Sequence, residues 1–126
     1  MTCAKPIVIV VDDDLSILRA LRRLLSGAGF DVRAFARPTA VLNADLPTAE
    51  ACLVVDVHLP EMSGIELCAK LATAGCRLPV ILITAHADEQ TRGLAESAHP
   101  MALLIKPFNR DLLVNSINTA LRARNP

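Results

Sequence analysis

Residues 53–64 read LVVDVHLPEMSG, and the rest of the chain is organised around this stretch. Its apolar, β-branched start predicts a buried strand that ends on the carboxylate of Asp56. Pro60 and Gly64 interrupt the backbone before the next periodic segment, so we expect Asp56 to lie where a strand meets a loop. A carboxylate is costly to bury without a partner. The fold must therefore bring other groups to Asp56.

The composition indicates a single domain over residues 1–126, which is near the most common domain size. Aromatic residues make up only 2% of the chain, so the core must consist of Leu, Val, Ile and Ala. Thirteen basic residues balance thirteen acidic ones, which argues against generic binding to nucleic acid or to a membrane surface. No apolar run approaches the roughly 20 residues of a membrane span, and no signal peptide is recognisable.

The cysteines Cys3, Cys52, Cys68 and Cys76 form no CxxC pair and no zinc-binding pattern. We interpret them as reduced thiols of a cytoplasmic protein, with Cys52 and Cys68 acting as small hydrophobic residues.

Apolar runs alternate with segments of helical periodicity along the whole chain. Strands are predicted at 7–11, 30–35, 53–56, 79–84 and 101–105, and helices at 15–27, 38–43, 65–75, 88–97 and 109–121. The helix at 88–97 is weak, because it has few apolar positions and contains Gly93. Continuous apolar strands separated by amphipathic helices predict a doubly wound α/β fold, in which helices cover both faces of a five-stranded parallel sheet.

Polar side chains follow four of these strands directly, at the ends where ligand sites of parallel sheets form. They are Asp12 and Asp13, Asp56, Thr84 and Lys106. If the strands are neighbours, three carboxylates, a hydroxyl and an ammonium group meet in one pocket. Three carboxylates repel each other unless a cation joins them. Mg²⁺, which prefers oxygen ligands, meets that requirement.

The same groups suit phosphoryl transfer, which depends mainly on positioning and charge stabilisation. Asp56 is the candidate nucleophile, and aspartyl phosphates are an established type of covalent intermediate. Lys106 can neutralise charge on an incoming phosphoryl group, and the Thr84 hydroxyl can donate to one of its oxygens.

Four motifs, in this order, resemble the receiver domain of response regulators in two-component signalling, of the chemotaxis-regulator type. They are VDDD at 11–14, Asp56 with LPEMSG at 59–64, Thr84-Ala85, and KPF at 106–108. The resemblance implies a flavodoxin-like fold with strand order 2-1-3-4-5. It also implies that a histidine kinase phosphohistidine phosphorylates Asp56, and that the domain catalyses only its own aspartyl phosphorylation and dephosphorylation.

The resemblance also implies a role for each matching residue. Asp13 would bind Mg²⁺ directly and Asp12 through water, together with Asp56 and the backbone carbonyl of His58. Thr84 and Lys106 would grip the phosphoryl oxygens. The Lys106–Pro107 peptide bond is cis in such domains and would direct the lysine into the site.

Two positions depart from the family pattern. Leu103 stands where the family usually has Tyr or Phe as a rotamer switch, and Ala98-His99-Pro100 replaces a turn that commonly contains glycine. An alternative hypothesis is therefore a receiver-like interaction module with atypical or no phosphorylation switching. His58 and His86 flank the site at positions that tune dephosphorylation in the family, although both residue types are also common in solvated loops.

The implied partners are a sensor histidine kinase and a downstream effector or covalently linked output domain, with no output domain expected within this chain. A homodimer through the face of the fourth and fifth helices also follows from the resemblance, whereas direct nucleic-acid and membrane contacts do not. The VDDDLS opening resembles receivers that precede helix-turn-helix output domains of the nitrogen-fixation-regulator type.

The same residues allow three other interpretations. Asp14, and less readily Asp12, can simply cap the following helix. A phosphatase of the haloacid-dehalogenase type has an Asp-x-Asp motif that residues 12–14 mimic only loosely, and no cap domain is present. A flavin-binding flavodoxin-like protein needs a phosphate loop after the first strand, where three aspartates would repel phosphate.

Overall fold

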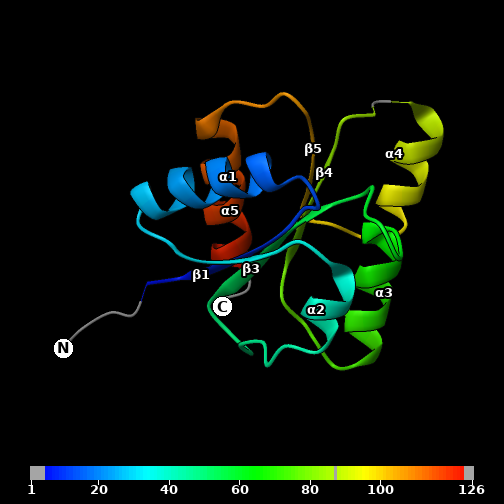
Figure 1. The fold of residues 1–126 in the computed structure, drawn as a ribbon, viewed down its shortest axis with the longest axis horizontal. Helices are drawn as coiled ribbons and strands as arrows, with labels where there is room; N and C mark the ends of the chain where they lie inside the picture. The colour runs from blue at the N-terminus through cyan, green and yellow to red at the C-terminus, as the bar shows by residue number, and fades with distance from the viewer. Residues whose placement is uncertain (1–4, 87, 124–126) are drawn as a thin grey trace.

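The computed structural model describes residues 5–86 and 88–123 and contains one parallel sheet between two layers of helices (Figure 1). The strands are β1 Ile7–Val11, β2 Asp31–Phe35, β3 Ala51–Asp56, β4 Val80–Thr84 and β5 Ala102–Ile105. Their order in the sheet is β2-β1-β3-β4-β5, with every neighbouring pair parallel. This confirms the α/β fold class and the strand order that the family resemblance implied.

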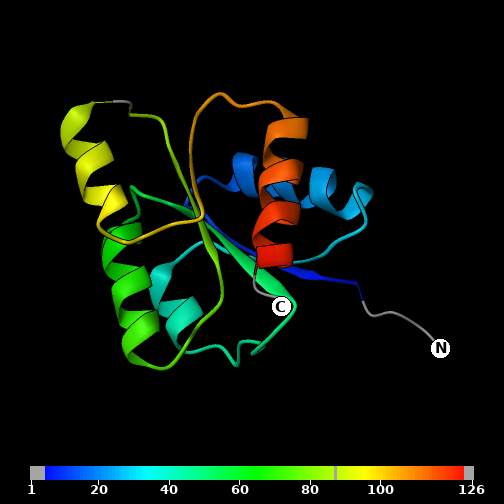
Figure 2. The same cartoon turned by 180° about the vertical axis from the view of Figure 1, so that it is seen from behind.

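Five helices connect the strands and cover both faces of the sheet. They are α1 Leu15–Gly27, α2 Pro38–Leu42, α3 Gly64–Thr73, α4 Glu89–Glu96 and α5 Arg110–Ala123. The two views show α1 and α5 together on one face, and α2, α3 and α4 on the other (Figures 1 and 2). Among the described residues, none of these helices combines the length and apolar character needed to cross a bilayer.

The continuous apolar strands supply both halves of the core. In β1, Val8 and Val10 pack toward α1 and α5, whereas Ile9 and Val11 pack toward the opposite helices. All six residues of β3 are buried, so the strand that carries Asp56 lies at the centre of the molecule. Successive side chains of a strand point to opposite faces of the sheet. Because helices cover both faces, the central strands are apolar on both sides, and the sequence shows continuous apolar runs instead of alternating apolar and polar residues.

The predicted element bounds agree with the structure to within one or two residues. β3 begins at Ala51 rather than Leu53, because Ala51 pairs in register with Ile7. The weakly predicted fourth helix forms as α4, capped by Asp88, whose side chain accepts a hydrogen bond from the Thr91 N–H.

The turn before β5 shows how this chain replaces a glycine. His99 adopts a φ of 50° in the left-handed region, which glycine enters most easily. Leu103, at the family's aromatic switch position, is partly buried and packs against the core beneath α3 and α4.

Candidate functional site

The carboxylates of Asp12, Asp13 and Asp56 meet at the carboxyl ends of the central strands. Each offers one oxygen, and these oxygens all lie within 4.8 Å of one another. β1 and β3 are hydrogen-bonded neighbours, so residues that follow β1 lie beside the last residue of β3. Asp12 is fully buried and Asp56 is 5% exposed, whereas Asp13 faces solvent.

Lys106 reaches this cluster from the loop after β5. Its Nζ lies 3.0 Å from Asp12 Oδ2 and 3.0 Å from Asp56 Oδ2. The Lys106 backbone N–H donates to the Thr84 carbonyl at 2.7 Å, and the following peptide bond to Pro107 is cis. The structure therefore brings the ammonium group to the acidic cluster, across 94 and 50 residues of sequence.

The two buried carboxylates each use their second oxygen on a backbone N–H group. Asp12 Oδ1 accepts from Asp14 N–H and Asp56 Oδ1 accepts from His58 N–H, both at 2.9 Å. Asp14 in turn accepts hydrogen bonds from the first turn of α1, which confirms its expected role as the N-cap. Both buried carboxylates are thus fixed in orientation by two partners.

Burial and pairing set the electrostatics of the site. Burial raises the pKa of Asp12 above its ordinary value, although the Asp14 N–H and Lys106 oppose this effect. For Lys106, burial lowers the pKa, but the hydrogen bonds and charges of Asp56 and Asp12 outweigh it and leave the pKa raised. Lys106 is therefore a cation at neutral pH.

Thr84 is fully buried at the end of β4, and its hydroxyl engages its own loop. The Oγ1 atom accepts from His86 N–H at 3.0 Å and donates to the His86 carbonyl at 3.4 Å. The rings of His58 and His86 meet edge to face with centroids 4.5 Å apart. The loops after β3 and β4 are thus in contact next to the cluster. The expected roles of His58 and His86 stay predictions.

Gly64 has a role beyond the backbone break that the sequence predicts. Its N–H donates to the Val57 carbonyl at 2.8 Å, and a Cβ at this position would collide with the backbone carbonyl oxygen of Asp56. Only glycine lets α3 begin this close to the end of β3.

The donor set fits a hard divalent cation. Three carboxylates within reach of one point match the preference of Mg²⁺ for oxygen ligands and few protein groups. Lys106 already offsets part of the negative charge of Asp12 and Asp56. The residues present therefore suit the magnesium site that the sequence predicted.

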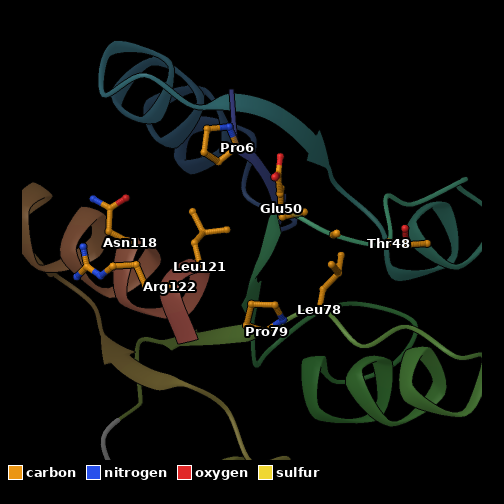
Figure 3. A pocket seen from close by; sticks show the side chains of 10 residues that line it. Pro6, Thr48, Glu50, Leu78, Pro79, Asn118, Leu121 and Arg122 are labelled. Atoms are coloured by element: carbon orange, nitrogen blue, oxygen red, sulfur yellow. The ribbon is translucent and has the colours of Figure 1, made fainter. Parts of the chain in front are cut away.

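One cavity of about 440 Å³ lies at the opposite edge of the sheet (Figure 3). Pro6, Glu50 and Pro79, near the beginnings of three strands, line it together with Asn118 and Arg122 of α5. Its lining contains none of the acidic cluster, Thr84 or Lys106. The candidate site, at the other ends of the strands, is therefore separate from this cavity.

Comparisons with known proteins agree with this geometry. A family model described as "Response regulator receiver domain" matches residues 8–118. The response regulator protein TmoT of Ectopseudomonas mendocina is 37% identical over 122 residues, which are 97% of this chain and 56% of that protein. The transcriptional regulatory protein FixJ of Bradyrhizobium diazoefficiens is 33% identical over 117 residues, or 93% of this chain and 57% of that protein.

Solved structures show the same relationship. The response regulator StyR superposes with a TM-score of 0.87 at 40% identity, over 96% of this chain and 61% of that one. Full-length FixJ from B. japonicum gives a TM-score of 0.89 at 32% identity, over 98% of this chain and 61% of that one. The chain spans about half the length of the curated relatives it matches.

Proposed function

The chain belongs to the receiver domain family of response regulators, and from this premise we propose that Asp56 accepts a phosphoryl group from the phosphohistidine of a sensor histidine kinase. The observation that carries the proposal is the convergence of Asp12, Asp13 and Asp56 with Lys106 bonded to two of them at 3.0 Å. Such a site has the nucleophile and the charge stabilisation that phosphoryl transfer requires.

Mg²⁺ would be held by Asp12, Asp13, Asp56 and the backbone carbonyl of His58. When bound, it supplies positive charge that stabilises the oxygens of the transferred group.

The protein's own groups account for the remaining steps. A carboxylate oxygen of Asp56 forms a bond to phosphorus as the bond to the kinase histidine breaks, and the imidazole leaves. Lys106 is already within hydrogen-bond distance of Asp56, so its ammonium group can donate to a phosphoryl oxygen. The Thr84 hydroxyl would exchange its contact with the His86 carbonyl for another phosphoryl oxygen. Hydrolysis by water then restores the Asp56 carboxylate and releases phosphate.

We further propose that this reaction controls partner binding in the cytoplasm. Curated relatives are about twice as long, and several carry the name transcriptional regulatory protein, which suggests control of transcription through an output domain or effector. Leu94 on α4 and Met101 just before β5 are 54% and 44% exposed, and we propose the partner surface in this region. A homodimer through the face of α4 and α5 remains part of this proposal.

Acetyl phosphate with Mg²⁺ tests the phosphorylation step directly. Intact-mass spectrometry should show the gain of one phosphoryl group, which Asp56→Asn and chelation of Mg²⁺ abolish. Asp111→Asn, a change at an exposed acid on α5, is the matched control and should be phosphorylated like the wild type. No mass gain in the wild type would contradict the proposal and favour an interaction module that is not phosphorylated.

A further inference from the structure

Glu61 lies in the loop between β3 and α3, and its carboxylate accepts hydrogen bonds from three donor groups of a segment that is distant in sequence. Glu61 Oε2 accepts from the Arg37 guanidinium at 2.8 Å, and Oε1 accepts from the Thr39 hydroxyl at 2.9 Å and from the Thr39 N–H at 3.3 Å. The hydrogen bonds to Thr39 contribute most to lowering the pKa of Glu61, so the carboxylate is ionised at neutral pH.

Helix α2 lacks an N-cap of its own. Arg37 occupies the N-cap position but makes no side-chain capping hydrogen bond, and Pro38 follows it at the first helical position. The first turn of a helix has free N–H donors that must find partners elsewhere. Glu61 supplies that acceptor for Thr39 from 22 residues away in sequence.

The loop around Glu61 also depends on its contact with α2, because few other hydrogen bonds hold this loop. On one side, His58 N–H is bonded to Asp56 Oδ1. On the other, Gly64 N–H is bonded to the Val57 carbonyl. Within residues 5–86 and 88–123, the hydrogen bonds that join residues 59–62 to other segments are those of the Glu61 side chain.

We infer that Glu61 is a positioning residue that fixes the β3–α3 loop against α2 and thereby holds His58 ready for cation binding. The inference rests on the proposed function, in which the His58 carbonyl is a magnesium ligand. The hydrogen bonds of the Glu61 side chain go to Arg37 and Thr39 and not to Asp56, so Glu61 would act through the backbone between itself and His58.

The two residues that donate to Glu61, Arg37 and Thr39, are expected to stabilise the loop to different extents. The Arg37 side chain is 65% exposed and the Glu61 side chain 25% exposed, and ion pairs with an exposed partner contribute little. Thr39 is exposed as well, but its hydroxyl reaches both carboxylate oxygens of Glu61, at 2.9 and 3.2 Å, and a short side chain loses less conformational freedom than arginine in making such a contact. Thr39→Val should therefore loosen the loop more than Arg37→Met.

Hydrogen–deuterium exchange and calorimetry on the same proteins test the inference. In metal-free Glu61→Ala, the amides of residues 58–63, apart from Pro60, should exchange faster than in the wild type, while those of α5 keep their rates. Titration calorimetry should show a Mg²⁺ dissociation constant raised on the order of 10-fold, at the low end for residues that orient metal ligands. Thr39→Val should reproduce part of both effects, and the Glu61→Ala/Thr39→Val double variant should be no worse than Glu61→Ala.

Glu66→Ala is the matched control, because Glu66 is an exposed glutamate in the first turn of α3, outside the contact with α2. It should leave loop exchange and Mg²⁺ affinity unchanged. Wild-type exchange and affinity in Glu61→Ala, or equal losses in Glu66→Ala, would overturn the inference. A wild-type protein that binds no Mg²⁺ would instead overturn the proposed function, and with it the link from Glu61 to the cation.

Discussion

Asp12 combines full burial with a bond to the Lys106 ammonium group, and these two features act in opposite directions on its carboxylate. The effect of burial on the pKa is larger than that of Lys106, and the pKa of Asp12 therefore lies above its ordinary value of 3.8. The folded protein thus binds this proton more tightly than the unfolded chain does. The ionised form of Asp12 therefore lowers the stability of the metal-free protein. A site that holds an unfavourable charge in this way is suited to receive a cation.

We predict that Asp12→Asn raises the free energy of unfolding at pH 7 in the absence of Mg²⁺. Asparagine keeps the oxygen that accepts from the Asp14 N–H but cannot ionise. The wild type loses stability as the pH rises from 3.8 through the raised pKa of Asp12, so the difference should be full above that pKa and vanish below 3.8.

Urea unfolding followed by circular dichroism across this pH range measures the difference. Asp14→Asn is the control, because asparagine is an equally good N-cap and Asp14 is exposed. An Asp12→Asn protein that is less stable than the wild type at pH 7 would contradict the argument.

Lys106 is predicted to act in the transition state as well as in the resting site. Lys106→Met should slow phosphorylation by acetyl phosphate by about 30- to 1,000-fold, equivalent to about 2–4 kcal/mol, as for other donors to developing negative charge. The raised pKa of Lys106 means that its charge, and hence the difference between the two proteins, should persist throughout the neutral pH range.

Initial rates of phosphoprotein formation at saturating Mg²⁺ measure this effect. Lys70→Met removes an exposed lysine of α3 and should leave the rate unchanged. Equal rates for Lys106→Met and the wild type would remove Lys106 from the reaction.

At the scale of elements, the start of α3 lies in close contact with the end of β3. Ser63 caps the helix by accepting from the Glu66 N–H at 3.1 Å, and Gly64 lies against the last peptide of β3. The site loop is therefore held between a strand end and a helix start, with Glu61 linking it to α2. A displacement of α3 toward β3 would therefore bring Gly64 against the Asp56 carbonyl.

Gly64→Ala should lower the free energy of unfolding by about 1–3 kcal/mol, the range for inserting a methyl group into a packed region. The added Cβ meets the Asp56 carbonyl, which cannot move without shifting the end of β3. Gly93→Ala is the matched control: a Cβ at Gly93 of α4 meets no atom within 4 Å, so that change should stabilise by about 0.5–1 kcal/mol. Urea unfolding of both variants tests the contrast, which fails if Gly64→Ala is as stable as the wild type.

The periodicity of the sequence was sufficient to predict the helices and strands. It also predicted that the acidic residues, Thr84 and Lys106 lie at one edge of the sheet, because the carboxyl ends of parallel strands share that edge. It was insufficient for properties that depend on three-dimensional contacts. Adjacent aspartates gave no sign that Asp12 is buried while Asp13 is exposed. The Glu61–Thr39 contact joins segments with no local pattern in common, and the close approach at Gly64 depends on where α3 packs.

In the whole molecule, the site lies at the end of the most buried strand. β3 pairs with β1 on one side and β4 on the other, and its residues supply both halves of the core. A cation bound at Asp56 should therefore stabilise the central sheet and not only the loops around it. Ligand that binds only the folded state stabilises it by about 2.7 kcal/mol at 100 times its dissociation constant.

Cys52, in the middle of the molecule, can report this coupling. It lies in β3 with no exposure, and burial raises the pKa of its thiol to about 12, so it should react with thiol reagents only when the protein opens. We predict that Mg²⁺ at 100 times its dissociation constant slows modification of Cys52 about 100-fold, in proportion to the population of the open state.

Peptide mass spectrometry after timed labelling measures Cys52 and Cys76 in the same sample. Cys76 is partly exposed and should react at nearly the same rate with and without Mg²⁺, because it needs no global opening. Asp13→Asn should remove the protection of Cys52, since it removes one of the three negative charges of the acidic cluster without touching the core. Protection that survives in Asp13→Asn would place the cation elsewhere, because stabilisation of β3 would then not depend on the carboxylates at its end.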